Sequence, residues 1–288
     1  MLQYVYMKKY ILFLGFGISI CTIFFYGFAR QHVFFDVPPP TTSSKFIEKP
    51  FKQEPVGIPI TATFTLPILS LHHIGTPPAS LSADAKTWYL SEQKFEELLK
   101  AISEWNLTPL TAHQVVQSLQ SGYLTDRAIL LTFDDGAIDF YTHAFPLLKK
   151  YNIHSTVFLQ SHVRSKAWLS DEHIQELANS NLIEFGSHTK YHQYLTRVSE
   201  EVAKSELKES KQKIESIIGN DYIVSSLAYP FGLYNNKVKE WANEAGYDIA
   251  FTIDGGAIQL RDDPFAFTRI IITNTTNIEK LLAQYYSL

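Results

Sequence analysis

The sequence predicts one large α/β domain with a mostly parallel sheet, which is either closed as a barrel or open. After Pro67, short apolar runs of strand length alternate with segments whose apolar residues recur at helical spacing. The links between these segments are short. The chain has 288 residues, of which 45% are hydrophobic, so it is long enough to bury a sizeable core.

The strand predictions rest on short apolar runs. The clearest run is Ala128–Phe133, because it is apolar at nearly every position and ends in polar residues. In chain order, the predicted strands are Ile68–Leu71, Ala128–Phe133, Ser155–Leu159, Leu182–Phe185, Ser226–Tyr229, Ile249–Thr252 and Arg269–Thr273. Repeated β–α units bring the carboxyl ends of parallel strands to one edge of the sheet.

Two helices are predicted between the first two strands. Ser91 can cap a helix. The apolar face of this helix carries Phe95, Leu98, Leu99 and Ile102. Thr111 and Gln114 form a capping box for the second helix, which Gly122 is expected to end.

Two further helices are predicted in the second half of the chain. Residues 199–218 form a long charged segment that is followed by Gly219 and Asn220. Residues 277–285 close the chain as an amphipathic helix.

Two adjacent carboxylates follow the clearest strand, in Thr132-Phe133-Asp134-Asp135-Gly136. Neighbouring Asp side chains repel each other, so a fold that places both at a strand end normally supplies a cation or a proton. Gly136 allows the chain to turn tightly there. Taken alone, the pattern fits a solvated turn at least as well.

A second polar segment, Ser187-His188-Thr189-Lys190-Tyr191-His192, follows the strand predicted at Leu182–Phe185. One helical turn would place the imidazoles of His188 and His192 on one face. Two His and one carboxylate form a usual ligand set for a catalytic zinc that keeps a position open for water. Together with the Asp pair, this segment indicates a metal site.

These motifs resemble those of the polysaccharide deacetylase family, also called the NodB-homology family or carbohydrate esterase family four. Residues 132–136 match its first motif, residues 187–192 match the spacing of its second, and residues 228–232 resemble its third. A fourth match, at residues 68–74, is similar to the branch that deacetylates biofilm poly-β-1,6-N-acetylglucosamine.

The resemblance covers roughly residues 67–288 and implies a distorted, incomplete (β/α) barrel. It implies that Asp135, His188 and His192 hold one divalent metal ion. Zinc is the expected ion, although this ligand set also accepts cobalt, nickel, iron or manganese. Asp134 would be the general base that takes a proton from the attacking water.

The resemblance implies two more catalytic groups. Tyr229 matches the position whose backbone N–H stabilises the oxyanion. His72 aligns with the general acid of the biofilm branch, which would protonate the departing glucosamine nitrogen. The adjacent His73 would face the other way if the strand continues through it.

Many family members carry an Arg shortly before the third motif, but residues 223–228 contain none. Arg269 is the expected substitute that orients Asp134, while a plain surface or core-edge position for Arg269 remains an equal alternative. Four aromatic residues flank the motifs and are candidates for lining a glycan groove: Tyr191, Tyr194, Phe231 and Tyr234.

The N-terminus carries a membrane signal. Lys8 and Lys9 precede an almost uninterrupted apolar run, Tyr10 to Ala29. This run reaches the length of about 20 residues that a bilayer-spanning helix needs, and the lysines predict that the chain beyond it lies outside the cytoplasm. We favour an uncleaved anchor, with a cleaved signal peptide as the alternative. The start of translation is either Met1 or Met7.

The predicted organisation has three parts. Residues 1–30 form the signal-anchor or signal peptide, residues 31–66 an extracytoplasmic linker that includes three consecutive prolines, and residues 67–288 the catalytic domain. In the alternative for the end of the linker, residues 56–64 pack against the domain as an irregular flap. The sequence leaves the oligomeric state open.

Composition excludes other classes of protein. The formal net charge of −4 gives no basic excess for nucleic acid. The single Cys, Cys21, excludes an intramolecular disulfide. An unrelated metal-dependent phosphoesterase is disfavoured because the sequence offers no second ligand cluster.

The predicted function is therefore metal-dependent N-deacetylation of an extracellular N-acetylglucosamine polysaccharide, first of all poly-β-1,6-N-acetyl-D-glucosamine. Peptidoglycan and chitin oligomers are the alternative substrates, and removal of O-acetyl groups from xylan is less favoured. The alternative outside catalysis is a glycan-binding relative that has lost turnover. The intact Asp-Asp-His-His set argues against that alternative.

Overall fold

The computed structural model describes residues 57–163, 165–219 and 221–287. The predicted membrane segment (residues 1–30) and residues 31–56 of the predicted linker lie outside these ranges. Within the described ranges, none of the helices has the length and apolar character that crossing a membrane requires.

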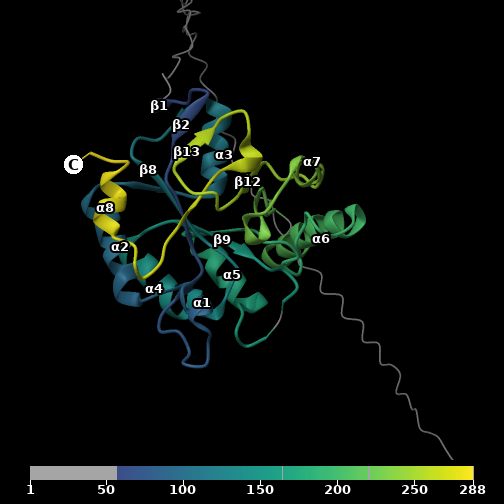
Figure 1. Cartoon of the computed structure of the whole chain (residues 1–288), viewed down its shortest axis with the longest axis horizontal. Helices are drawn as coiled ribbons and strands as arrows, with labels where there is room; N and C mark the ends of the chain where they lie inside the picture. The colour runs from purple at the N-terminus through teal and green to yellow at the C-terminus, as the bar shows by residue number, and fades with distance from the viewer. Residues whose placement is uncertain (1–56, 164, 220, 288) are drawn as a thin grey trace, which may run out of the picture. The chain divides into compact units, whose positions relative to one another are not determined.

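A curled parallel sheet lies at the centre of the described residues (Figure 1). Its strand order is β12-β11-β10-β9-β8-β3-β14, and β6 pairs in addition with β8. The bounds are β3 (Ile68–Leu71), β6 (Thr108–Leu110), β8 (Ala128–Phe133), β9 (Ser155–Leu159), β10 (Ile183–Ser187), β11 (Ser226–Ala228), β12 (Ile249–Phe251) and β14 (Ile270–Ile271). All these pairings are parallel, which confirms the predicted α/β class.

The sheet curls toward a barrel but closes only in part. Its order places β12 and β14 at opposite ends. Phe267, which precedes β14, forms a single parallel bridge to Phe251 in β12, and the N–H of Phe267 donates to the carbonyl of Ala250 at 3.0 Å. This arrangement confirms the predicted incomplete barrel.

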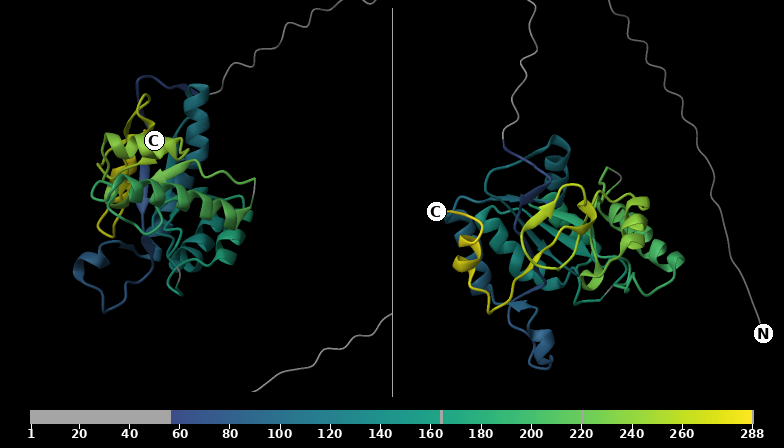
Figure 2. Two further views of the ribbon diagram at one scale, coloured as in Figure 1. Left: turned by 90° about the vertical axis from the view of Figure 1, so that its right-hand side faces the viewer. Right: turned by 45° about the horizontal axis from the view of Figure 1, so that its top comes forward.

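The helices lie around the outside of the curled sheet (Figures 1 and 2). Their bounds are α1 (Ala83–Lys86), α2 (Glu92–Glu104), α3 (Ala112–Ser121), α4 (Phe145–Tyr151), α5 (Asp171–Asn179), α6 (Glu200–Ile218), α7 (Asn236–Glu244) and α8 (Ile278–Ala283). The predicted capping signals are confirmed. The hydroxyl of Ser91 accepts a hydrogen bond from the N–H of Lys94, Thr111 and Gln114 form the capping box, and Gly122 ends α3 at a φ of 79°.

The first described residues enter the fold earlier than the predicted domain start at residue 67. Four short strands are involved, namely β1 (Ile58–Pro59), β2 (Thr63–Thr65), β7 (Tyr123–Leu124) and β13 (Ile258–Leu260). β1 pairs antiparallel with β7, and β2 pairs antiparallel with β13. Ile60 and Leu66 are buried, so this segment packs against the domain through apolar contacts.

The strands that carry the site are anchored in the core. Every residue of β8 is buried, and Phe133 at its end packs edge-to-face against Phe95 of α2 and Phe140. β8 is paired on both edges, so the carboxylates that follow it leave from a fixed point. Such packing limits the movement of the first residues after the strand.

Gly186 in β10 tests how tightly this sheet is packed. A Cβ at this position would lie 2.5 Å from the ring of Phe158 and 2.5 Å from Oγ of Ser226. We expect Gly186→Ala to lower the free energy of unfolding by about 1–3 kcal/mol, because extra volume in a filled core forces neighbours to shift. Urea unfolding followed by circular dichroism measures this change. An unchanged midpoint would show that the sheet adapts at β10.

Candidate metal centre and active site

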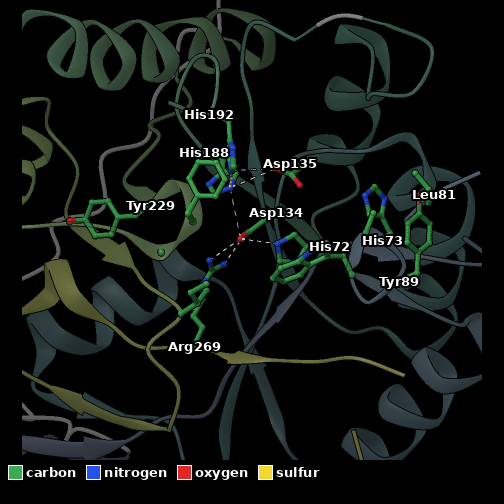
Figure 3. A pocket seen from close by; sticks show the side chains of 15 residues that line it. His72, His73, Leu81, Tyr89, Asp134, Asp135, His188, His192, Tyr229 and Arg269 are labelled. Atoms are coloured by element: carbon green, nitrogen blue, oxygen red, sulfur yellow. Dashed lines mark hydrogen bonds and ion pairs between the residues drawn. The ribbon is translucent and has the colours of Figure 1, made fainter. Parts of the chain in front are cut away.

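Six polar side chains converge at the carboxyl edge of the parallel sheet (Figure 3). They are His72 after β3, Asp134 and Asp135 after β8, His188 after β10, His192, and Arg269 before β14. All six line one cavity of about 490 Å³. The cavity lies where a parallel α/β sheet is expected to place its chemistry, outside the carboxyl ends of the strands.

Asp135, His188 and His192 each point one ligand atom at a common centre. Nε2 of His188 lies 3.7 Å from Oδ1 of Asp135, Nε2 of His192 lies 4.0 Å from the same oxygen, and the two nitrogens are 3.1 Å apart. Tetrahedral ligands at zinc-type bond lengths are about 3.3 Å from one another. The three side chains therefore fit a single small divalent ion.

The hydrogen bonds of these residues also suit metal binding. Nδ1 of His188 donates to the carbonyl of Ala228 at 2.8 Å, which leaves a lone pair on the inward-facing Nε2. Burial, together with the neighbouring His188, lowers the pKa of His192 to about 4, so this ring is neutral near pH 7. Gln160 donates to Oδ1 of Asp135 at 2.6 Å and holds that carboxylate in place.

The loop that carries the two histidines differs from the expected helical turn. Thr189 has a φ of 66° and His192 a φ of 58°, so both adopt left-handed backbone conformations. The hydroxyl of Ser187 accepts from the N–H of Thr189, and the hydroxyl of Thr189 accepts from the N–H of His192, each at 3.1 Å. A hydrogen-bonded loop with two left-handed residues therefore brings the imidazoles together, in place of a helical turn.

Asp134 forms a buried ion pair with Arg269. The guanidinium donates to both carboxylate oxygens, at 2.7 and 2.8 Å, and the exposed fractions of Arg269 and Asp134 are 0% and 3%. Burial, the largest single effect, would raise the pKa of Asp134, but the charge and hydrogen bonds of Arg269, together with the neighbouring His188 and His72, outweigh it and hold this pKa well below its usual range. Asp134 is therefore ionised throughout the neutral range.

His72 lies on the other side of Asp134. Its Nε2 is 3.8 Å from Oδ2 of Asp134, and its ring lies 4.4 Å from that of Trp88. Burial lowers the pKa of His72, and the Asp134 charge opposes this effect. His73 does not face away from the site, as a continued strand would require. His73 lines the same cavity, and its Nδ1 is hydrogen-bonded to Oδ2 of Asp139 at 2.6 Å. The alternation of a strand does not apply to His73 because β3 ends at Leu71.

The role expected for the backbone of Tyr229 is wrong. Its N–H donates to the carbonyl of Phe251 at 3.0 Å, where β11 runs beside β12, so the sheet occupies this donor. The Tyr229 hydroxyl donates to the carbonyl of Phe265, and the side chain points away from the metal ligands (Figure 3). Among the described residues, the backbone N–H of Phe231 has no hydrogen-bond partner, and Phe231 lines the cavity.

Aromatic side chains flank both sides of the metal ligands. The ring centroid of Phe231 lies 4.4 Å from that of His192 and 3.8 Å from that of Tyr194, on which it stacks. These contacts keep Phe231 and Tyr194 near the cavity. Tyr234 instead stacks on the ring of Tyr229, and Tyr191 is half exposed. Trp88 was missed by sequence reasoning because it lies in a segment without a motif, and only the path of the chain brings it to His72.

Comparison with known proteins relates the chain to one family. Residues 121–250 match the family described as polysaccharide deacetylase. The chain is 27% identical over 210 residues to the Bacillus subtilis (strain 168) protein YxkH, named as a polysaccharide deacetylase, covering 72% of this chain and 71% of that protein. It is 27% identical over 209 residues to the poly-β-1,6-N-acetyl-D-glucosamine N-deacetylase of Staphylococcus epidermidis, covering 67% and 71%.

A solved structure is similar as well. The deacetylase PplD of Streptococcus pyogenes, solved in complex with acetate, superposes with a TM-score of 0.72 at 27% identity. The superposition covers 78% of this chain and 99% of that chain, so it includes nearly the whole of the solved protein.

The ion pair of Arg269 gives a prediction on the metal-free protein. Arg269→Met leaves Asp134 buried without its partner, which should lower the free energy of unfolding by roughly 3–5 kcal/mol at pH 7. In the wild type, the lowered pKa of Asp134 stabilises the fold above the unfolded-state pKa of about 3.9. This stabilisation is lost as the pH falls through the folded-state pKa.

In the variant, the contribution of Arg269 is lost while burial still acts to raise the pKa of Asp134, so protonation relieves the penalty as the pH falls. The stability gap between wild type and variant should therefore be smaller at pH 4 than at pH 7. Urea unfolding at both pH values measures it. A gap that is equal at the two pH values would mean that Arg269 stabilises the fold by packing alone.

Proposed function

We propose that the chain, whose residues 121–250 match the polysaccharide deacetylase family, is a metal-dependent N-deacetylase of an extracellular N-acetylglucosamine polysaccharide and thus a hydrolase of carbon–nitrogen amide bonds. One observation supports this proposal above all. Ligand atoms of Asp135, His188 and His192 surround one centre, and the buried pair of Asp134 and Arg269 lies beside it.

Asp135, His188 and His192 would hold the ion. A divalent ion of the zinc type supplies Lewis acidity, which lowers the pKa of water and polarises the acetyl carbonyl. The choice among zinc, cobalt, nickel, iron and manganese follows availability as well as affinity, since this donor set accepts each of them. Gln160 and Ala228 would fix the directions of two of these ligands through their hydrogen bonds.

Asp134 would act as the general base. Its lowered pKa keeps it ionised, and Oδ2 faces the ligand cluster at 4.0 Å from Nε2 of His188. Arg269 fixes the direction of the carboxylate by holding both oxygens. Asp134 can thereby accept the proton that the attacking water loses as its oxygen bonds to the acetyl carbon.

His72 would act as the general acid. Its lowered pKa means that most of it is unprotonated near pH 7 before reaction. We infer that the proton taken by Asp134 passes on to His72, since Nε2 lies 3.8 Å from Oδ2. His72 then protonates the sugar nitrogen as its bond to the acetyl carbon breaks, so water and amide become acetate and a free amine.

The oxyanion donor that we propose is the backbone N–H of Phe231, in place of Tyr229. Phe231 has a φ of 59°, and among the described residues this N–H is free at the wall of the cavity. Pro230, which has no N–H, and Gly232 fix the backbone on both sides. The donor would stabilise the negative charge that develops on the carbonyl oxygen.

Poly-β-1,6-N-acetyl-D-glucosamine is the proposed substrate. The position of His72 at the end of β3, ahead of the Asp pair, supports it, as does the name of the Staphylococcus epidermidis relative. Peptidoglycan and chitin oligomers are the alternatives. We further propose that residues 1–30 tether the protein to the membrane, with the catalytic domain outside the cytoplasm.

An acetate-release screen tests the substrate. Purified protein loaded with zinc is given β-1,6-linked and β-1,4-linked N-acetylglucosamine oligomers and peptidoglycan, with and without a chelator. We expect acetate from the β-1,6-linked oligomers and loss of the activity on chelation. Faster release from β-1,4-linked oligomers or peptidoglycan would transfer the assignment to that polymer, and no release from any of them would contradict the activity.

Two variants separate the base from the ligands. Asp134→Asn removes the proton acceptor and should reduce acetate release by at least about 100-fold while zinc content stays near that of the wild type. His188→Ala removes a ligand and should lose most of the bound zinc. Zinc content by elemental analysis and acetate release by an enzymatic assay are measured on each. Full activity of Asp134→Asn would refute its role as base.

A further inference from the structure

A buried carboxyl group lies behind the metal ligands, on α6. Glu206 is 4% exposed, although a Glu side chain is almost never fully buried unless it is paired. Its Oε2 accepts hydrogen bonds from the backbone N–H groups of Lys190 and Tyr191, at 2.9 and 2.8 Å. One oxygen of a helix residue is thus bonded to two successive amides of a loop.

Those two amides lie in the middle of the loop between His188 and His192. Left-handed backbone conformations are strained for residues other than glycine, so surrounding contacts must maintain those of Thr189 and His192. At the start of the loop, the hydroxyl of Ser187 accepts a hydrogen bond from the N–H of Thr189. At its end, the hydroxyl of Thr189 accepts one from the N–H of His192. Glu206 provides the contact to its middle.

We propose that Glu206 is a positioning residue for the metal site, which holds the loop of residues 189–192 so that His192 faces Asp135 and His188. This inference rests on the metal site of the proposed function. Residues that orient metal ligands typically change metal affinity by 10- to 100-fold when they are removed. Glu206 would act on His192 through the backbone, without contact to substrate.

The position of Glu206 in the fold supports a role specific to this loop. Ser210, one turn later on α6, hydrogen-bonds the hydroxyl of Ser187 at 2.7 Å, so the helix also contacts the end of β10 from which the loop leaves. Glu209 on the same helix contacts Lys190 as well, but through the exposed ammonium group, at 2.6 Å. Glu209 therefore offers a matched control that leaves the backbone of the loop untouched.

The test measures zinc affinity on metal-free protein, by competition with a chromophoric chelator. Glu206→Ala removes the acceptor, Glu206→Asp shortens its reach, and Glu206→Gln keeps one oxygen that can accept from both amides. We expect the Ala and Asp variants to bind zinc at least about 10-fold more weakly, the Gln variant to stay within about 3-fold of the wild type, and Glu209→Ala to be unchanged.

Hydrogen exchange of the metal-free proteins provides a second readout. The amides of Lys190 and Tyr191 should lose protection in Glu206→Ala and Glu206→Asp and keep it in Glu206→Gln. A purely structural role would instead lower the thermal midpoint of all three variants without this pattern in affinity. If Glu206→Ala does not fold, which circular dichroism would show, the Asp and Gln variants still decide the comparison.

Wild-type zinc affinity in folded Glu206→Ala or Glu206→Asp would overturn the inference, as would an equal loss in Glu206→Gln. Because zinc affinity needs no substrate, the two proposals can fail separately. Tight zinc binding without acetate release would contradict the proposed function alone. Acetate release with unaltered affinity in the Glu206 variants would contradict the positioning role alone.

Discussion

The buried pair of Arg269 and Asp134 is the interaction on which the rest of the site depends. Arg269 precedes the last strand of the curled sheet, yet its guanidinium bonds Asp134 after the central strand β8 and its Nε donates to the carbonyl of Thr252, which follows β12. It therefore joins three parts of the sheet, whose two ends are linked within the described residues by the single bridge between Phe251 and Phe267. Either buried charge would destabilise the interior without its partner. The segments that carry Arg269 and Asp134 are therefore held together.

Two adjacent carboxylates acquire different surroundings in this frame. Asp134 is directed into the protein toward Arg269, while Asp135 adopts a φ of 75° and turns toward His188 and His192. One carboxylate is paired with a fixed cation of the protein, and the other faces two imidazoles around the proposed metal position. This division would resolve the repulsion between neighbouring Asp residues, because Arg269 neutralises Asp134 and the proposed ion would neutralise Asp135.

The sequence determined the α/β class and the positions of the main strands along the chain, and it predicts the ligand set. These follow from local rules, since apolar periodicity identifies strands such as β3, β8 and β9 at their observed bounds, and side-chain caps identify the starts of α2 and α3. The carboxyl ends of parallel strands meet at one edge, so a motif after each strand is enough to predict that Asp135 and His188 come together.

Tertiary structure alone decided which backbone donor is free and how the histidine loop is held. The N–H of Tyr229 is consumed by pairing of β11 beside β12, whereas that of Phe231 is left at the cavity, and this depends on where a parallel strand stops. Glu206, Gln160 and Trp88 reach the site from segments without motifs. Their contacts join residues distant in sequence, and no local pattern of polarity or spacing encodes which distant side chain will fill a given place in the fold.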